Sequence, residues 1–271
     1  MLLFFVFFVF CIYCVQSWDY EYSMHTLNIL SLNVNGLNSA VKRTRVLEYL
    51  HRKSISCALI QETHLKQSDV ARFQNKYYKL IAFSCAQNKT KGVLILVNRK
   101  LNLTVEHIGS DEKGRFVFIR CKIYNNRLAL VSIYGPNETD SAFLTQISKT
   151  LLEEIDCPLV VGGDFNAVIN PALDKSQSDT TANPSSKLLN KFITELNLID
   201  LWRIQNTKAK DFTFFSNRHK TFSRIDYIFL SPSLISSNSS ISILSILLSD
   251  HSAVLCSVPL SDVKAKLTYH Y

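Results

Sequence analysis

The sequence contains no internal repeat, and no closely spaced pair of cysteines stands near a second cysteine pair or a histidine pair. Cys11 and Cys14, the closest two of seven cysteines, lie in an apolar N-terminal segment, which argues against a zinc site. Cys57, Cys121 and Cys256 lie inside apolar runs and are interpreted as small buried side chains of strands. Charged residues make up only 19% of the chain against 47% hydrophobic residues, and this balance excludes an intrinsically disordered protein.

Acidic residues are outnumbered, since 22 Asp and Glu face 30 Lys and Arg and leave a net charge of +8. Such a surplus favours a polyanionic partner, because each phosphate neutralised by a basic side chain releases condensed counterions. A merely basic surface explains the charge about equally well. Aromatic residues interleaved with basic ones at 72–78 and 212–224 favour nucleic acid over that alternative.

The first fifteen residues are almost entirely apolar but are too few to span a bilayer, and they lack the basic start of a signal peptide. A sequon at Asn137-Glu138-Thr139 falls in a predicted active-site loop, which argues against secretion. We therefore predict that residues 1–24 are an apolar leader, signal-like or upstream read-through, followed by one domain at 25–260 and a tail at 261–271. The nucleus is the expected location, with secretion as the alternative. The chain is also expected to lack room for a reverse transcriptase.

Apolar runs alternate with amphipathic segments along the rest of the chain, and no linker interrupts residues 27–260. This pattern predicts an α/β domain in which two mixed β-sheets pack face to face and helices flank them. Polar stretches at 170–183 and 231–240 are predicted to be surface connections. Helices are expected at 39–52, 141–155 and from 183, and strands at 27–34, 57–60, 80–85, 92–98, 103–108, 116–124, 128–134, 158–161, 212–215, 225–230, 241–248 and 253–258.

Polar side chains follow successive strand ends, where an open α/β fold collects its catalytic groups. Hydrolysis of a phosphodiester needs a cationic clamp on the phosphate, a base for water and help for the leaving oxygen. Magnesium keeps several waters, so one or two acidic ligands suffice. The groups at the six strand ends are Asn33, Glu62, Tyr134 with Asn137, Asp164 with Asn166, Asp226, and Asp250 with His251.

Each of these residues also has a plain structural interpretation. Glu62 alone is most often a solvated loop carboxylate, Asn33 a turn residue and Tyr134 a packing aromatic. Asp226 stands among apolar residues, where an acid is costly unless it is paired. Asp164 is the strongest single candidate, because two glycines before it allow a ligand or backbone to approach closely. Only the ordered set favours catalysis.

From about residue 27 to 258 the chain resembles the endonuclease/exonuclease/phosphatase superfamily, whose members include exodeoxyribonuclease III and abasic-site endonucleases. It is most similar to the endonuclease domain of long interspersed (non-LTR) retrotransposons. The resemblance implies a four-layer α/β sandwich, the DNase I-like fold. Seven blocks carry it, in order: Leu32-Asn33-Val34-Asn35-Gly36-Leu37-Asn38, Gln61-Glu62-Thr63-His64, Ile133-Tyr134-Gly135-Pro136-Asn137, Gly163-Asp164-Phe165-Asn166, Thr213-Phe214-Phe215-Ser216, Ile225-Asp226-Tyr227 and Ser249-Asp250-His251.

The resemblance implies a Mg²⁺ cofactor, with Mn²⁺ as a substitute. Glu62 would be the main ligand, helped by Asn33 and Asp250, and Asp250 would also orient His251. These assignments agree with the need to offset charge that develops on the phosphate oxygens.

The remaining catalytic roles also follow from the resemblance. Asp164 would position and deprotonate the attacking water, and Asn166 would hold the phosphate or that carboxylate. Tyr134 would hydrogen-bond the phosphate or the leaving group, and Asp226 would also act on the phosphate and the leaving group. His251 would bind the scissile phosphate.

Four further residues are implied to contact the substrate or support the site: Asn137, Thr213, Ser249 and Lys175. Lys175 marks a departure, because relatives carry Leu-Asp-Arg-Ser where this chain has Leu173-Asp174-Lys175-Ser176. Lysine lacks the bidentate fork of arginine, so a phosphate contact there would be weaker.

The function expected from this resemblance is a magnesium-dependent endonuclease that nicks one DNA strand, acting as a monomer with DNA as partner and no stable membrane partner. The first alternative is an exodeoxyribonuclease III-like or abasic-site DNA repair nuclease. A phosphoinositide phosphatase or sphingomyelinase relative is a further alternative, which the basic charge disfavours. The alternative from another class is a catalytically silent DNA-binding module.

Overall fold

The computed structural model describes residues 16–177, 184–218 and 220–269, and it describes side chains within residues 24–261 of these ranges. A six-stranded sheet contains, in spatial order, β12 (Ser240–Ile243), β13 (Val254–Tyr269), β1 (Gln16–Asn33), β2 (Cys57–Gln61), β4 (Val93–Asn98) and β3 (Tyr78–Ser84). A five-stranded sheet contains β11 (Asp226–Leu230), β8 (Leu159–Asp164), β7 (Asn126–Tyr134), β6 (Phe116–Ile123) and β5 (Leu103–Ser110). A separate short hairpin pairs β9 (Phe214–Ser216) with β10 (Thr221–Ser223).

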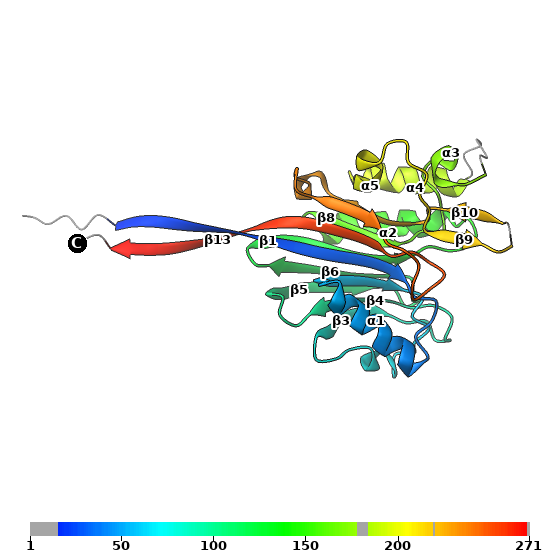
Figure 1. The fold of residues 1–271 in the computed structure, drawn as a ribbon, viewed down its shortest axis with the longest axis horizontal. Helices are drawn as coiled ribbons and strands as arrows, with labels where there is room; N and C mark the ends of the chain where they lie inside the picture. The colour runs from blue at the N-terminus through cyan, green and yellow to red at the C-terminus, as the bar shows by residue number, and fades with distance from the viewer. Residues whose placement is uncertain (1–15, 178–183, 219, 270–271) are drawn as a thin grey trace, which may run out of the picture.

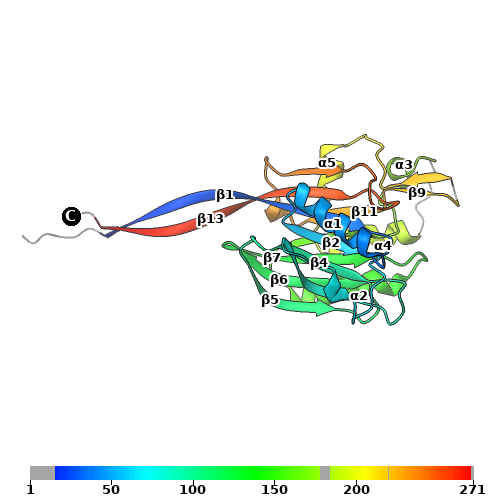
Figure 2. The same cartoon turned by 60° about the horizontal axis from the view of Figure 1, so that its bottom comes forward.

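The two larger sheets pack face to face, and Figure 2 shows them as neighbouring layers. Leu59 and Ile95 of the six-stranded sheet share one buried apolar cluster with Ile119 and Leu130 of the five-stranded sheet. Removal of this apolar surface from water is the main force that holds the two layers together.

Helices cover the outer faces of both sheets. On the six-stranded sheet lies α1 (Ala40–Arg52), which begins where the Ser39 side chain accepts a hydrogen bond from the Lys42 amide and which buries Val46, Leu47 and Leu50. On the five-stranded sheet lie α2 (Ser141–Glu154) and α4 (Pro184–Glu195), while α5 (Leu201–Gln205) lies beside β11 and β12 (Figure 1). The predicted four-layer fold is confirmed.

β1 and β13 are longer than predicted. They pair from Gln16↔Tyr269 to Ser31↔Val254, and the outer part of this pair extends away from the sandwich as a two-stranded ribbon (Figure 1). The strands therefore run across residues 24 and 261, where we placed the boundaries of the domain, and the division of the chain stays a prediction. Among the described residues no helix has the length and apolarity needed to cross a membrane.

The strand predicted at 241–248 ends early. β12 pairs with β13 only as far as Ile243↔Val254, because the chain must then turn back, and its next residues form the connecting loop with Leu247 largely exposed. The predicted start of a helix at Asn183 lies outside the described residues, although α4 follows directly. We did not predict β10, α5, α3 (Pro171–Asp174) or the two 3-10 turns, η1 (Val70–Arg72) and η2 (Pro232–Leu234).

Candidate active site

The two sheets bring the predicted strand ends to one edge of the sandwich. Tyr134 at the end of β7 lies beside Asp164 at the end of β8, and Asp226 at the start of the antiparallel β11 lies on the other side of Asp164. Asn33 ends β1 in the opposite sheet, yet its side-chain amide donates to a carboxylate oxygen of Asp164 at 2.9 Å. This bond joins the two sheets at the site.

A buried triad of Asp164, Asp226 and His251 forms the centre of the site. Nδ1 of His251 lies 2.9 and 3.1 Å from the two carboxylate oxygens of Asp226, and Nε2 lies 4.0 Å from Oδ2 of Asp164. All three side chains are buried. The ring of His251 is therefore held from one nitrogen and presents the other toward Asp164.

The triad sets its own protonation states. Burial alone would lower the pKa of His251, but the adjacent carboxylate of Asp226 outweighs burial and raises that pKa to about 10. Burial and the nearby Asp226 raise the pKa of Asp164 to about 7, although His251 and hydrogen bonds from Asn166 and Asn33 oppose the rise. At neutral pH the imidazole is thus a cation, and the pKa of Asp164 lies close to the surrounding pH.

Asp226 is placed by Thr213. The Thr213 hydroxyl accepts from the amides of Ile225 and Asp226 at 3.1 and 3.2 Å, and its carbonyl accepts from the amide of Ser252 at 2.7 Å. Phe214 stacks on the ring of His251 with centroids 4.6 Å apart. Thr213 is fully buried, so it supports the site from behind.

The two glycines before Asp164 serve the packing of the backbone. A Cβ at Gly163 would overlap the carbonyl oxygen of Ile133 on the neighbouring strand, and one at Gly162 would press on the side chain of Leu59 across the core. Of the two interpretations of these glycines, close approach of protein atoms is therefore the one that the structure shows.

Asn166 and Asn137 extend the site beyond Asp164. The Asn166 amide donates to the Asp164 carboxylate at 2.9 Å, while its side chain donates to the Gly135 carbonyl at 3.0 Å and to the side-chain oxygen of Asn137 at 3.1 Å. Asn166 adopts a left-handed backbone conformation with φ of 50°, which asparagine tolerates better than most residues. Asn137 is exposed.

Glu62 and Tyr134 lie together beside this centre. Burial and a hydrogen bond with Glu62 raise the pKa of the Tyr134 hydroxyl well above its usual range, so this hydroxyl is a donor at any physiological pH. Glu62 follows β2 in a left-handed conformation with φ of 50°, and its Oε2 lies 3.6 Å from Nε2 of His64. The Arg115 guanidinium stacks over the Tyr134 ring at 5.0 Å.

The surroundings of Glu62 fit a divalent cation. Asp250 lies close by, since Asn35, two residues beyond Asn33, donates to its carboxylate at 3.1 Å. The Lys42 ammonium donates to the Asn35 carbonyl at 3.0 Å; burial lowers its pKa, whereas both Asp250 and Glu62 act to raise it. Glu62 and Asp250 thus both act on the Lys42 ammonium, and carboxylate oxygens of this kind suit Mg²⁺.

One predicted pairing is wrong. We expected Asp250 to orient His251, but that position belongs to Asp226. Residues 247–250 form a bend in which Asp250 is exposed, and its carboxylate accepts from Asn35 and Ser249 instead. Ser249 therefore holds Asp250, and its hydroxyl also accepts from the His251 amide at 3.3 Å.

The loop predicted to lie at the surface around 170–183 is partly buried, which corrects that prediction for its described part. Lys175 forms an isolated β-bridge with Ser223 and is half-buried, so it lies beside β10. Asp174, the residue before it, is fully buried against two arginines. The 231–240 loop likewise buries Ser239.

The sequence profile of the Endonuclease/Exonuclease/phosphatase family matches residues 26–251. The chain belongs to this family. The resemblance predicted from the seven motifs is thus confirmed.

Three known proteins are similar to this chain in sequence or in structure. The Transposon TX1 uncharacterized 149 kDa protein of Xenopus laevis is 27% identical over 248 residues, covering 90% of this chain and 19% of that protein, so this chain spans about a fifth of its relative's length. AP endonuclease LMAP from Leishmania major has a TM-score of 0.71 at 17% identity, covering 86% of this chain and 87% of that one. The endonuclease domain of TRAS1, a telomere-specific non-LTR retrotransposon, has a TM-score of 0.64 at 17% identity, covering 86% and 98%. These two structures support the fold.

Sequence reasoning missed several residues of this family member's site: Asn35, Lys42, His64 and Arg115. Asn35 and His64 stand inside two of the recognised blocks, so their position was a usable signal. Lys42 and Arg115 lie outside every block, and only the fold brings them to Asn35 and Tyr134.

Proposed function

We propose that this chain is a Mg²⁺-dependent endonuclease, with Mn²⁺ able to replace Mg²⁺, which hydrolyses a phosphodiester of DNA and nicks a single strand. The observation that carries the proposal is the convergence of Asp164, Asp226 and His251 next to a second group of oxygen donors around Glu62 and Asp250. Membership of a family of nucleases and phosphatases gives the hydrolase class, and the details below are our proposal.

Glu62 and Asp250 would hold the metal ion, with Asn33 beside them. When bound, the ion supplies positive charge to the phosphate oxygens. His251 supplies a second positive charge, because its Nε2 remains protonated and is free of Asp226, which binds Nδ1. A metal ion held by these residues and the imidazolium would both offset the negative charge that builds up on the phosphate oxygens in the transition state.

Asp164 is the proposed general base. Its pKa of about 7 lies near the operating pH, where a base best combines availability with proton affinity. The Asn33 side chain and the Asn166 amide hold its two oxygens, so its direction is fixed before a water arrives. Tyr134 remains a donor and would bind the phosphate or the leaving oxygen.

DNA is the proposed substrate and partner. The net charge of +8 suits a polyanion, and similarity to a transposon protein and to a retrotransposon endonuclease domain favours the retroelement type of nicking. Asn137, Ser249 and Lys175 would contact the strand from the rim of the site, with Thr213 behind it. We propose a monomer that acts in the nucleus.

The second candidate is an abasic-site or exodeoxyribonuclease III-like repair nuclease, which the likeness to AP endonuclease LMAP favours. The same catalytic groups serve both functions, so substrate choice must separate them. A catalytically silent DNA-binding module is the candidate from outside the enzymes. The intact set of polar groups disfavours it.

The test is relaxation of supercoiled plasmid by the full-length protein in Mg²⁺, with Glu62→Gln and His251→Asn as variants and the exposed Glu153→Gln as the matched control. We expect nicked circles from wild type and control, a fall of about a hundredfold or more in both variants, and no product in EDTA. An oligonucleotide with one abasic site, cut faster than plasmid by about a hundredfold, would favour the repair candidate. Absence of cleavage on both substrates would refute the nuclease proposal.

A further inference from the structure

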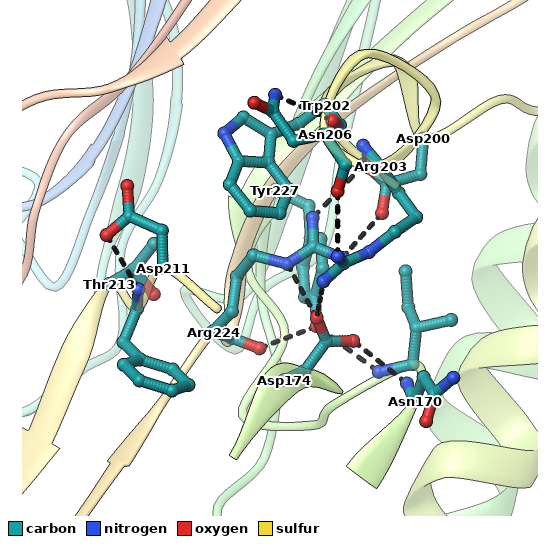
Figure 3. Close-up of polar contacts among 12 residues, drawn as sticks. Asn170, Asp174, Asp200, Trp202, Arg203, Asn206, Asp211, Thr213, Arg224 and Tyr227 are labelled. Atoms are coloured by element: carbon teal, nitrogen blue, oxygen red, sulfur yellow. Dashed lines mark hydrogen bonds and ion pairs between the residues drawn. The ribbon is translucent and has the colours of Figure 1, made fainter. Parts of the chain in front are cut away.

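Four charged residues, which we name the Asp174 network, bind one another around the buried carboxylate of Asp174 (Figure 3). The network consists of Asp174, Asp200, Arg203 and Arg224. One oxygen of Asp174 accepts from Nε of Arg224 at 2.9 Å and from Nη2 of Arg203 at 2.6 Å. The two outer nitrogens of Arg224 donate to both oxygens of Asp200 at 3.1 and 2.7 Å. Asp174 has no exposed surface and Arg224 only 2%.

Asp174 and Arg224 also contact the backbone and two aromatic rings around them. The second oxygen of Asp174 accepts from the amide of Asn170, and its carbonyl accepts from the amide of Arg224, both at 2.9 Å. Arg224 is stacked between Trp202 and Tyr227 at 4.7 and 4.6 Å from the ring centroids. The Tyr227 hydroxyl donates to the Arg224 carbonyl at 2.6 Å. Residue 224 is therefore held by its side chain, its amide and its carbonyl.

The network reaches the triad along two segments of chain. In the first segment, Arg224 is followed by Ile225 and then by Asp226, whose carboxylate binds the ring of His251. Arg203 donates to the carbonyls of Asn206 and Ala209 at 3.0 and 2.9 Å, and this segment leads to Thr213.

These two segments meet at the Thr213 hydroxyl, which accepts from the amides of both Ile225 and Asp226. The carboxylate of Asp174 links the two segments, because Arg203 at the start of one and Arg224 at the start of the other both donate to it.

We infer that Asp174 is a positioning residue of the phosphodiester site: by tying Arg203 to Arg224 it sets where Thr213 holds Asp226, and so where His251 presents its Nε2. A buried ion network is weak evidence for stability, because apolar groups of the same volume often serve as well. The hydrogen bonds between these charged groups have fixed directions, whereas apolar packing would not fix the direction of any contact. This inference deepens the proposed nuclease function and rests on it for its kinetic consequence.

The test compares Asp174→Asn with two other variants of the full-length protein. Arg224→Lys keeps the positive charge but loses the guanidinium that binds both Asp174 and Asp200. It provides a second test of the inference if Asp174→Asn does not fold. Leu151→Ala removes a buried side chain of α2 away from the site and controls for lost stability. All three are compared at a temperature where each is folded by circular dichroism.

The first readout needs no activity: amide hydrogen exchange at Ile225, Asp226 and Ser252, the three donors that Thr213 holds. We expect exchange there to rise by about tenfold or more in Asp174→Asn and Arg224→Lys relative to Leu151→Ala. The second readout is plasmid nicking, where kcat should fall by about tenfold or more while Kd for duplex DNA in EDTA changes by less than about threefold.

Exchange at the three amides that matches the Leu151→Ala control would overturn the inference, as would unchanged kcat in either folded network variant. If the wild type does not nick DNA but the three amides respond as expected, the nuclease proposal fails and the positioning role stands. If kcat falls and the Kd for DNA rises while exchange is unaltered, Asp174 serves only stability or binding, which also overturns the inference.

Discussion

Replacement of Asp226 by asparagine should remove the charge that keeps His251 protonated. In the folded protein the pKa of His251 is raised from 6.5 to about 10 against the effect of its own burial. At about 1.4 kcal/mol per pKa unit this shift corresponds to at most about 5 kcal/mol of stabilisation. The loss of one partner of a buried ion pair costs about 3–5 kcal/mol in general, which agrees with that ceiling. The substitution also relieves the repulsion between Asp226 and Asp164, which offsets part of this cost. We therefore expect the free energy of unfolding to fall by about 3 kcal/mol near pH 6.5.

The stability difference between wild type and Asp226→Asn should change with pH in a defined direction. A raised histidine pKa stabilises the fold fully below the unfolded value of about 6.5, and the stabilisation is lost as the pH rises through the folded value of about 10. The difference in unfolding free energy between wild type and Asp226→Asn should therefore shrink steadily from about pH 6.5 to about pH 10.

Urea unfolding followed by circular dichroism at several pH values measures this difference. Asp156→Asn, which alters an exposed carboxylate paired with Arg127, is the control and should change stability by less than about 1 kcal/mol. A loss in Asp226→Asn below about 1 kcal/mol near pH 6.5, or one that stays constant up to pH 10, would refute the assignment of a buried imidazolium.

Three further outcomes are expected. The rate of plasmid nicking should rise with pH through about 7 as Asp164 loses its proton and fall near about 10 as His251 loses its own; a flat profile between about pH 5.5 and 8 contradicts the base role. Glu62→Gln should weaken Mn²⁺ binding in calorimetry by about tenfold or more, whereas Glu106→Gln on the far strand β5 leaves it unchanged. Thr213→Val leaves two buried amides without an acceptor and should lower unfolding free energy by about 1–3 kcal/mol in urea; a loss under about 0.5 kcal/mol refutes its supporting role.

The strand ends could be predicted from the sequence because an apolar run followed by a polar residue is a strong local signal. Asp164 follows Leu159–Gly163 and lies at the end of β8 as expected, and Asn33 ends β1 in the same way. Parallel pairing of β7 with β8 then places Tyr134 beside Asp164 without any further information. Local pattern and strand order together suffice for this part of the site.

The pairing of side chains could not be predicted in the same way. Asp226 and Asp250 are both acids near His251 in the sequence or the fold, and only the tertiary structure shows that Asp226 lies next to the ring. Asp174 stands in a polar stretch that indicates a loop, and its burial depends on Arg203 and Arg224, which come from two distant segments. Contacts between segments of this kind leave no periodic trace in the sequence.

The arrangement of charge also decides which group of oxygens suits a metal ion. Asp164, Asp226 and His251 offer ligand atoms within 4.8 Å of one another, which is the spacing of a metal site. However, a histidine with a pKa of about 10 carries a proton on each nitrogen at neutral pH and has no lone pair to give. Asp226 already directs both oxygens to that ring.

Glu62 and Asp250 differ from the triad in each of these respects. Asp250 is exposed to water, Glu62 is only half-buried, and both carboxylates act to raise the pKa of Lys42. A hydrated Mg²⁺ keeps several of its waters and so favours this wetter position. In the mechanism that we propose, the buried triad is then left for proton transfer and for binding the phosphate.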